Sequence, residues 1–189
     1  MKTVKLIALL LVAGTFALFA QKIDIKPTDA VVKWTGSKII GGGHNGEIKV
    51  KSGSLELKDG NIVKGNVVID MKSISCKDIE NETYNKKLVD HLNSDDFFGV
   101  EKFPTATFAI TKAGKFNNGK ANVSGKVTIK GKTEPINFEV TKQNNVYKTQ
   151  LKVDRSKFDV RYGSNSFFDN LGDKAIDNIF ILDIQLTAN

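Results

Sequence analysis

The chain has 189 residues and a formal net charge of +7, with 28 Lys and Arg against 21 Asp and Glu. Apolar residues make up 40% and charged residues 26%, a balance typical of globular proteins, which excludes a disordered tail, a collagen-like fibre and a multi-span membrane protein. The 16 glycines and 12 phenylalanines against 3 prolines favour many short elements joined by tight turns, and therefore a single β-rich domain.

The first twenty residues have the features of a secretory signal peptide. Met1–Lys5 carries two lysines, Leu6–Val12 is continuously apolar, and Ala20 offers a small residue for cleavage. The apolar run is too short to span a bilayer comfortably. We therefore predict a signal peptide over residues 1–20 and one mature domain over residues 21–189, periplasmic or secreted.

Cysteine usage agrees with a simple exported protein. Cys76 is the only cysteine, so no disulfide can form within the chain. No cysteine lies near the predicted cleavage site either, which argues against a lipid-modified N-terminus. We expect a soluble protein rather than a lipoprotein.

Beyond the first thirty residues, apolar side chains recur at every second position, as in strands with one buried face. Val67, Ile69 and Met71, for example, alternate with Val68 and Asp70. With this stretch the pattern gives about eight or nine strands. The others lie at Val32–Trp34, Ile48–Val50, Leu55–Leu57, Ala106–Ile110, Val123–Ile129, Ile136–Val140, Tyr147–Val153 and Phe180–Leu186.

One segment departs from this rhythm. Residues 78–93 have helical spacing, with Glu82 and Lys86 placed to pair on the polar face. The residues four apart on the apolar face are Tyr84, Leu88 and Leu92.

A sheet of this size is costly to leave with two open edges. We therefore expect an all-β fold with one or two short helices, closed into an eight-stranded antiparallel barrel. A barrel of this size is filled by its own side chains or holds one small ligand, and the composition does not decide between the two.

Two motifs carry a resemblance to a known family. Asp90–Phe98 (DHLNSDDFF), followed by Phe103–Phe108 (FPTATF), is similar to the signature of the YceI-like family of exported bacterial lipid and polyisoprenoid binders. The chain differs from the family pattern at Gly99, where an acidic residue is usual, and at Asp159, where glycine is usual. Further similar stretches are Gly125–Pro135, His44–Ile48, and Arg155 with Phe158.

The resemblance implies a lipocalin-like barrel with an elongated apolar cavity that takes an isoprenoid chain, as in polyprenyl or quinone-like lipids. We accordingly predict a binding protein that holds or transports such a lipid, and not an enzyme. The predicted cavity residues are Trp34, Ile48, Val67, Ile69, Met71, Leu88, His91, Phe97, Phe98, Phe108, Ile110, Phe138, Val140, Leu151 and Arg155.

Alternatives remain open at this stage. The same inward side chains could meet in the middle, giving a ligand-free structural or protein-interaction barrel with a packed core. Within residues 90–103, Ser94 could cap the turn after the helix while Phe97 and Phe98 plug one barrel end. The loop could equally be a lid whose phenylalanines touch the lipid tail and whose His91 approaches its head.

No other chemistry is indicated by the motifs. Gly41, Gly43 and Gly46 have dinucleotide-motif spacing, but a strand-like stretch follows where a helix is needed. His44 and His91 are the only histidines, and no cysteine or carboxylate cluster repeats at zinc spacing. We therefore predict no metal site and no cofactor other than the bound lipid.

The charges are scattered along turns and wet strand faces. This distribution favours a solvated surface, with transient contact to anionic membranes, over nucleic-acid binding. We expect Arg161 to pair with Asp173 or Asp177, whereas Arg155 either pairs in the same way or meets a lipid head group.

Overall fold

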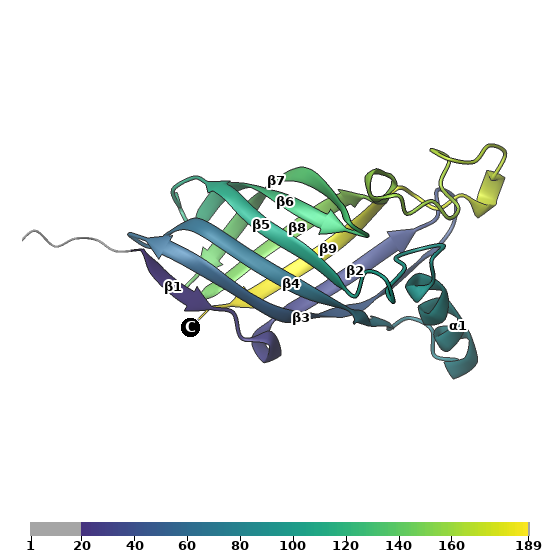
Figure 1. The fold of residues 1–189 in the computed structure, drawn as a ribbon, viewed down its shortest axis with the longest axis horizontal. Coiled ribbons are helices and arrows are strands. Elements are labelled where there is room, and N and C mark those ends of the chain that lie inside the picture. Colours follow the sequence, from purple (N-terminus) through teal and green to yellow (C-terminus); the bar gives the residue numbers. More distant parts are fainter. Residues whose placement is uncertain (1–19, 189) are drawn as a thin grey trace, which may run out of the picture.

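A computed structural model describes residues 20–188, so that all but the last residue of the predicted signal peptide lies outside the described part. Within that part, the strands form one antiparallel sheet in the order β1-β3-β2-β9-β8-β7-β6-β5-β4, which a further β3–β4 pairing closes (Figure 1). No helix of the described chain is long and apolar enough to cross a membrane. The strands are β1 (Gln21–Asp24), β2 (Val31–Ser37), β3 (Gly43–Lys58), β4 (Asn61–Cys76), β5 (Thr105–Ala113), β6 (Lys120–Ile129), β7 (Lys132–Gln143), β8 (Val146–Asp154) and β9 (Ile179–Thr187), and the helices are η1 (Pro27–Asp29), α1 (Glu82–Asn93), η2 (Arg155–Phe158) and η3 (Gly172–Lys174).

The closed ring has eight strands, because β1 and β2 share one position in it. β1 pairs with the stretch of β3 from Ser54 to Leu57, and β2 pairs with the stretch from Gly43 to Ile48. The two strands thus follow one another along the same edge of β3, separated by η1. The predicted eight-stranded antiparallel barrel is confirmed.

The strands predicted at Ile48–Val50 and Leu55–Leu57 are parts of the single strand β3, which is a correction to the sequence-based prediction. The β3–β4 ladder shifts register between Val50 and Ser52, as at a β-bulge. A bulge moves later side chains to the other face, so that Val50 and Leu55, five positions apart, are both buried. In the sequence, this switch of the inward-facing positions from even to odd residue numbers cannot be told apart from a break between two strands.

Helix α1 begins at Glu82, four residues later than predicted. The side chain of Asn81 accepts a hydrogen bond from the Tyr84 amide at 3.1 Å and caps the helix. Leu92 is buried as expected, but Tyr84 is 66% exposed, because the first turn lies beyond the apolar surface of the barrel. The predicted pair of Glu82 and Lys86 is also wrong: Lys86 pairs with Asp90 at 2.6 Å, one turn further along.

Replacing the cap tests this helix start. Asn81→Ala is expected to lower the free energy of unfolding by about 1 kcal/mol, because the first turn loses an acceptor for its free amide groups. Urea denaturation followed by circular dichroism measures the change. Asn81→Asp keeps an acceptor oxygen and should retain most of the stability, and equal losses in both variants would contradict the capping role.

One stretch of the barrel wall lacks a continuous ladder. β7 and β8 pair only from Thr141–Lys148 to Gln143–Val146, next to their connecting turn. Further on, the hydroxyl of Thr149 donates to the Glu139 carbonyl at 2.8 Å. We call the remaining junction, residues 132–140 against residues 149–154, the β7–β8 seam; among the described residues, no ladder pair joins its two sides.

Candidate binding cavity

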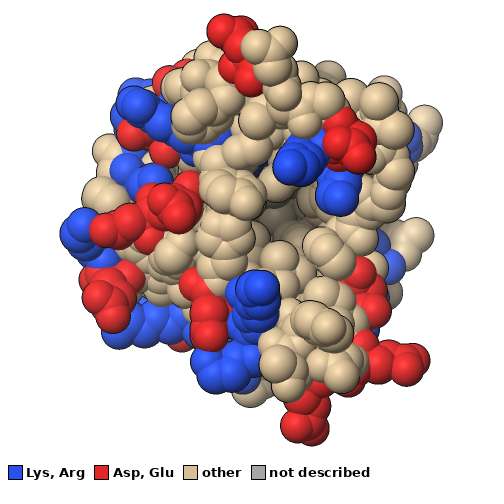
Figure 2. All heavy atoms as spheres, turned by 90° about the vertical axis from the view of Figure 1, so that its right-hand side faces the viewer, with Lys and Arg blue, Asp and Glu red and all other residues tan. Residues whose placement is uncertain are grey.

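The interior of the barrel is hollow. A cavity of about 610 Å³ lies within the ring, and this volume is typical of small-molecule sites. Strands β2 to β9 and helix α1 all contribute to its lining. Figure 2 looks onto the end of the molecule that carries α1 and shows a hollow among uncharged side chains, with charged residues around it. The alternative of a fully packed core does not agree with this cavity.

Every residue that the sequence predicts for the cavity lines it. For the predicted residues on strands the reason is the strand period: inward positions of a closed antiparallel sheet alternate with outward ones, so one correct face identifies the whole strand. The other predicted residues, which lie on α1, in the turn after it and in η2, come instead from the helical spacing and the family resemblance. Contact between these side chains and a ligand remains a prediction.

Other lining residues were missed. Those on β9 follow an alternation that was visible in the sequence, whereas Tyr162 and Ile176 lie in the segment between η2 and β9 and carry no periodic signal. The principal additional residues are Val32, Leu55, Ile62, Ile74, Ile129, Tyr147, Val153, Tyr162, Ile176, Phe180, Leu182, Ile184 and Leu186.

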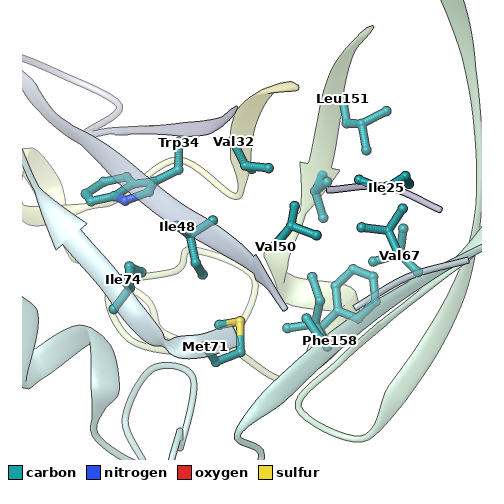
Figure 3. Packing of buried hydrophobic residues seen from close by; sticks show 14 of the residues in the cluster. Ile25, Val32, Trp34, Ile48, Val50, Val67, Met71, Ile74, Leu151 and Phe158 are labelled. Carbon is teal, nitrogen blue, oxygen red and sulfur yellow. The ribbon is translucent and has the colours of Figure 1, made fainter. Parts of the chain in front are cut away.

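Large side chains from different strands share the interior. Trp34 from β2, Ile48 from β3 and Met71 from β4 project toward a common space (Figure 3). Further round the wall Phe108 from β5 and Phe138 from β7 meet edge to face, with ring centroids 5.3 Å apart. Gly125 lies between their strands, and a Cβ there would be 2.6 Å from the Phe108 ring, so this glycine makes room for the ring. Aromatic and branched groups therefore line the cavity without filling it.

Aromatic rings gather at the α1 end of the cavity. The ring of His91, in the last turn of α1, lies 5.2 Å from that of Phe97 and 4.3 Å from that of Tyr162. Phe98 adjoins Phe97 at 5.8 Å. We call His91, Phe97, Phe98 and Tyr162 the aromatic cap; all four line the cavity. Both roles considered for residues 90–103, a plug and a lid, are compatible with this arrangement.

The turn after α1 holds the two phenylalanines of the cap in place. The Ser94 hydroxyl donates to the His91 carbonyl at 2.7 Å, and the Ser94 carbonyl accepts from the amides of Phe97 and Gly99. Gly99 has a φ of 57°, a left-handed conformation that glycine adopts without strain. Gly99 stands where the family pattern usually has an acidic residue, and its glycine suits the left-handed conformation of this tight turn.

Arg155 adjoins the aromatic cap, with its guanidinium carbon 5.8 Å from the centroid of the Phe97 ring, and is 3% exposed. Its guanidinium donates to the carbonyls of Asp177 at 3.0 Å, Val160 and Tyr162 at 2.9 Å, and Ile176 at 3.1 Å. Burial lowers the pKa of Arg155, an effect opposed by the nearby charge of Asp177. Its donors are thus directed mainly at the backbone, which ties η2 to the segment before β9 and assigns Arg155 a structural role at the cavity wall.

The sequence matches the YceI-like domain family over residues 12–188. The chain belongs to the YceI-like family. Among curated relatives, a UPF0312 protein of Vibrio vulnificus is 33% identical over 131 residues, covering 67% of this chain and 66% of the relative. A UPF0312 protein of Pseudomonas putida is 29% identical over 132 residues, covering 70% and 66% respectively. The chain thus matches slightly less than two thirds of the length of these relatives.

Solved structures share the fold of this YceI-like protein. BcnA of Burkholderia cenocepacia has a TM-score of 0.68 at 22% identity, covering 88% of this chain and 100% of its own. A polyisoprenoid-binding domain from Saccharophagus degradans, implicated in plant cell wall breakdown, has a TM-score of 0.60 at 13% identity, covering 88% and 97%. At these identities the likeness shows the barrel fold and nothing finer.

Asp159, the second departure from the family pattern, keeps a glycine-like backbone. It follows η2 with a φ of 60° and caps that helix in the left-handed conformation, which aspartate tolerates better than most residues. Its carboxylate meets Arg161 at 2.6 Å, and this hydrogen bond is the main cause of the lowered pKa of Asp159. The predicted pairing of Arg161 with Asp173 or Asp177 is therefore wrong, because a nearer carboxylate is available.

A cluster of three polar side chains lies at the α1 end of the YceI-like barrel, in addition to the aromatic cap. His44 Nδ1 is 2.9 Å from Asp78 Oδ2, and the Cys76 thiol donates to Asp78 Oδ1 at 3.2 Å. We call His44, Cys76 and Asp78 the rim cluster; His44 itself lines the cavity. Burial tends to raise the pKa of Asp78, but hydrogen bonds from the Asn45 amide, His44 and Cys76 lower it to about 2.

The three side chains of the rim cluster are not arranged as in a site that activates a thiol nucleophile. Such a site needs the sulfur next to a base that removes its proton, whereas here the thiol and the imidazole both contact the carboxylate. Burial raises the pKa of Cys76, and the hydrogen bond to Asp78 raises it further. The thiol is therefore held in its protonated, weakly nucleophilic form.

Proposed function

We propose that this protein holds an isoprenoid-type lipid, such as a polyprenyl or quinone-like molecule, in its barrel cavity and carries it as an exported, non-enzymatic binding protein. The observation that carries the proposal is the apolar cavity of about 610 Å³ enclosed by the barrel. An isoprenoid tail has no polar groups along its length, so its binding site needs a continuous apolar lining rather than a set of hydrogen-bond partners.

The driving force is sufficient for such a ligand. Each buried CH₂ group contributes roughly 0.8 kcal/mol, so a chain of about twenty carbons has on the order of 15 kcal/mol of gross stabilisation. Loss of translational freedom and ordering of the flexible tail offset much of this. The residual affinity is set by how well the wall fits the branched chain, which is why the shape of the lining matters more than its area.

The orientation of the ligand follows from the distribution of polar groups. Along β4 and β5 the lining is mainly apolar, for example at Ile69 and Phe108. One phenol, that of Tyr147, lies near the turn between β7 and β8. At the α1 end, by contrast, two polar rings lie next to each other, those of His91 and Tyr162, with centroids 4.3 Å apart. In our proposal the tail lies along the barrel axis and the polar head lies against the aromatic cap. The Lys and Arg side chains near the hollow in Figure 2 suit contact with anionic membrane surfaces during loading and release.

The remaining parts of the proposal rest on other observations. Export rests on the signal-like sequence of residues 1–20. A non-enzymatic role is supported by the arrangement of the rim cluster, because the Cys76 thiol has no neighbouring base there to remove its proton. The Saccharophagus degradans domain of the same fold is described as polyisoprenoid-binding, and this supports the ligand class.

Native lipid extraction tests the proposal. The protein is purified from the organism that encodes it, extracted with organic solvent and examined by mass spectrometry, with close to one isoprenoid molecule per chain as the expected result. Delipidated protein should then bind geranylgeraniol more tightly than octadecanol, since a branched chain fits the aromatic wall better. Recovery of protein without lipid, together with no binding of either alcohol, would overturn the proposal.

A further inference from the structure

The rim cluster brings together three side chains that commonly bind metal ions. One ligand atom each from His44, Cys76 and Asp78 lies within 4.8 Å of the others. We propose that the rim cluster is a binding site for a divalent transition-metal ion of the Zn²⁺ type. The inference is independent of the lipid proposal, because none of its supporting contacts involves the cavity ligand.

The donor set selects the class of metal. An imidazole nitrogen, a thiolate sulfur and a carboxylate oxygen are the three donor types that Zn²⁺ uses in proteins, whereas Ca²⁺ and Mg²⁺ prefer oxygen alone. With bond lengths of about 2.0–2.3 Å, ligand atoms around a tetrahedral zinc ion lie roughly 3.3–3.6 Å apart. One ligand atom from each of the three residues lies within 4.8 Å of the others. The two oxygens of Asp78 are already close to the other ligands, Oδ2 at 2.9 Å from His44 Nδ1 and Oδ1 at 3.2 Å from the Cys76 sulfur, so the side chains need to move little to reach the zinc spacing.

The backbone around the rim cluster is fixed before any ion binds. Gly46 and Cys76 are ladder partners of β3 and β4, and the approach is so close that a side chain at Gly46 would collide with the opposite backbone. The ladder geometry continues as the Lys77 amide donates to the Asn45 carbonyl at 2.9 Å. The Asn45 amide in turn donates to Asp78 Oδ1 at 3.0 Å, an outer-shell hydrogen bond of the kind that orients metal-binding carboxylates.

The charges also balance. A deprotonated Cys76 together with ionised Asp78 would carry two negative charges, which a divalent ion neutralises at a partly buried position. Binding of the ion releases the thiol proton to solvent, as is usual for cysteine ligands.

The three protein ligands leave a fourth coordination position for water or an external group. His44 is 47% exposed at its side chain and lines the cavity, and Asp78 is 26% exposed, while Cys76 is buried. The open position therefore faces the mouth of the barrel rather than the protein interior. Zinc sites with three protein ligands and one open position are accessible to small molecules.

This site departs from the metal-free prediction made from the sequence. His44 is separated from Cys76 and Asp78 by more than thirty positions, so no short metal-binding spacing exists to be found. The site is created by the antiparallel register of β3 against β4 and the turn that follows β4.

Cobalt and zinc titrations test the site. We would use the full chain as purified, without a histidine tag and after treatment with a chelator, and titrate Co²⁺ while recording absorption. One Co²⁺ per chain should bind and produce a thiolate-to-cobalt charge-transfer band in the near ultraviolet. Calorimetric titration with Zn²⁺ should give the same stoichiometry, and bound Zn²⁺ should slow the reaction of Cys76 with a thiol reagent.

Variants separate a built site from surface binding. Cys76→Ser should abolish the charge-transfer band, and His44→Ala should weaken Zn²⁺ binding at least about tenfold, since even outer-shell changes cost 10- to 100-fold. Asp90→Asn removes an exposed carboxylate outside the rim cluster and should leave binding unchanged. Absence of the band in the native protein, or equal Zn²⁺ affinity in the native protein and His44→Ala, would overturn the proposal. His44 is exposed, so its variant keeps the test informative even if Cys76→Ser fails to fold.

Discussion

Arg155→Met is expected to lower the free energy of unfolding by about 3–5 kcal/mol, because the loss of one buried charged donor group leaves several carbonyls without partners. Arg155 is 3% exposed and donates to four backbone carbonyls. Methionine has a similar length but no donor. Urea denaturation measures the change, and the same samples report whether the α1 end of the cavity still retains lipid.

The second arginine provides a matched control. Arg161 is largely exposed and pairs with Asp159, so Arg161→Met should change stability by no more than about 1 kcal/mol, as for other surface ion pairs. Arg155→Lys keeps the charge but not the planar fork of donors and should fall between the native protein and Arg155→Met. Equal losses at the two arginines would contradict the structural role of Arg155.

Filling the cavity should abolish lipid retention. Ile69→Trp and Phe108→Trp, made separately, each place a larger ring in the lining, and binding of geranylgeraniol is expected to fall by at least about tenfold because the tail loses room to bind. Stability should change by less than the roughly 1–3 kcal/mol typical of overpacked cores, since the added ring enters existing space. Tryptophan fluorescence and lipid titration measure the two effects.

Ala109→Trp is the control for these cavity variants. Ala109 adjoins Phe108 on β5 but is exposed, so its variant adds the same ring to the outside of the same strand. Lipid binding should remain at the native level. Unfolding by Ile69→Trp and Phe108→Trp would contradict a hollow interior, whereas unimpaired binding in both would place the ligand elsewhere.

The strand period was enough to predict the barrel and its inward faces. Ile69, Phe108 and Val140 all face the interior, because each lies in a regular stretch where one inward residue implies the next. The same reasoning failed at β3, because the bulge after Val50 exchanges the inward-facing and outward-facing positions of the strand. Local periodicity carries no information about a register shift that depends on the partner strand.

Groups brought together by tertiary structure were beyond the reach of the sequence pattern. Tyr162 completes the aromatic cap from a non-repetitive segment, and His44 meets Asp78 only through the pairing of β3 with β4. Arg155 lines the cavity, but its carbonyl partners, such as that of Ile176, depend on the path of the chain before β9. Such contacts have no counterpart in spacing along the chain.

The β7–β8 seam is the place where two neighbouring strands of the barrel can separate most easily. Amides of residues 132–140 that point across the seam have no ladder partner among the described residues, so they should exchange with deuterium earlier than those on the β6 side. Parting the two strands there breaks side-chain contacts and one threonine hydrogen bond, but no ladder rung. Separation of the two strands at the seam would open a lateral entrance to the cavity, so that a branched tail enters between β7 and β8 instead of passing along its whole length through the end of the barrel.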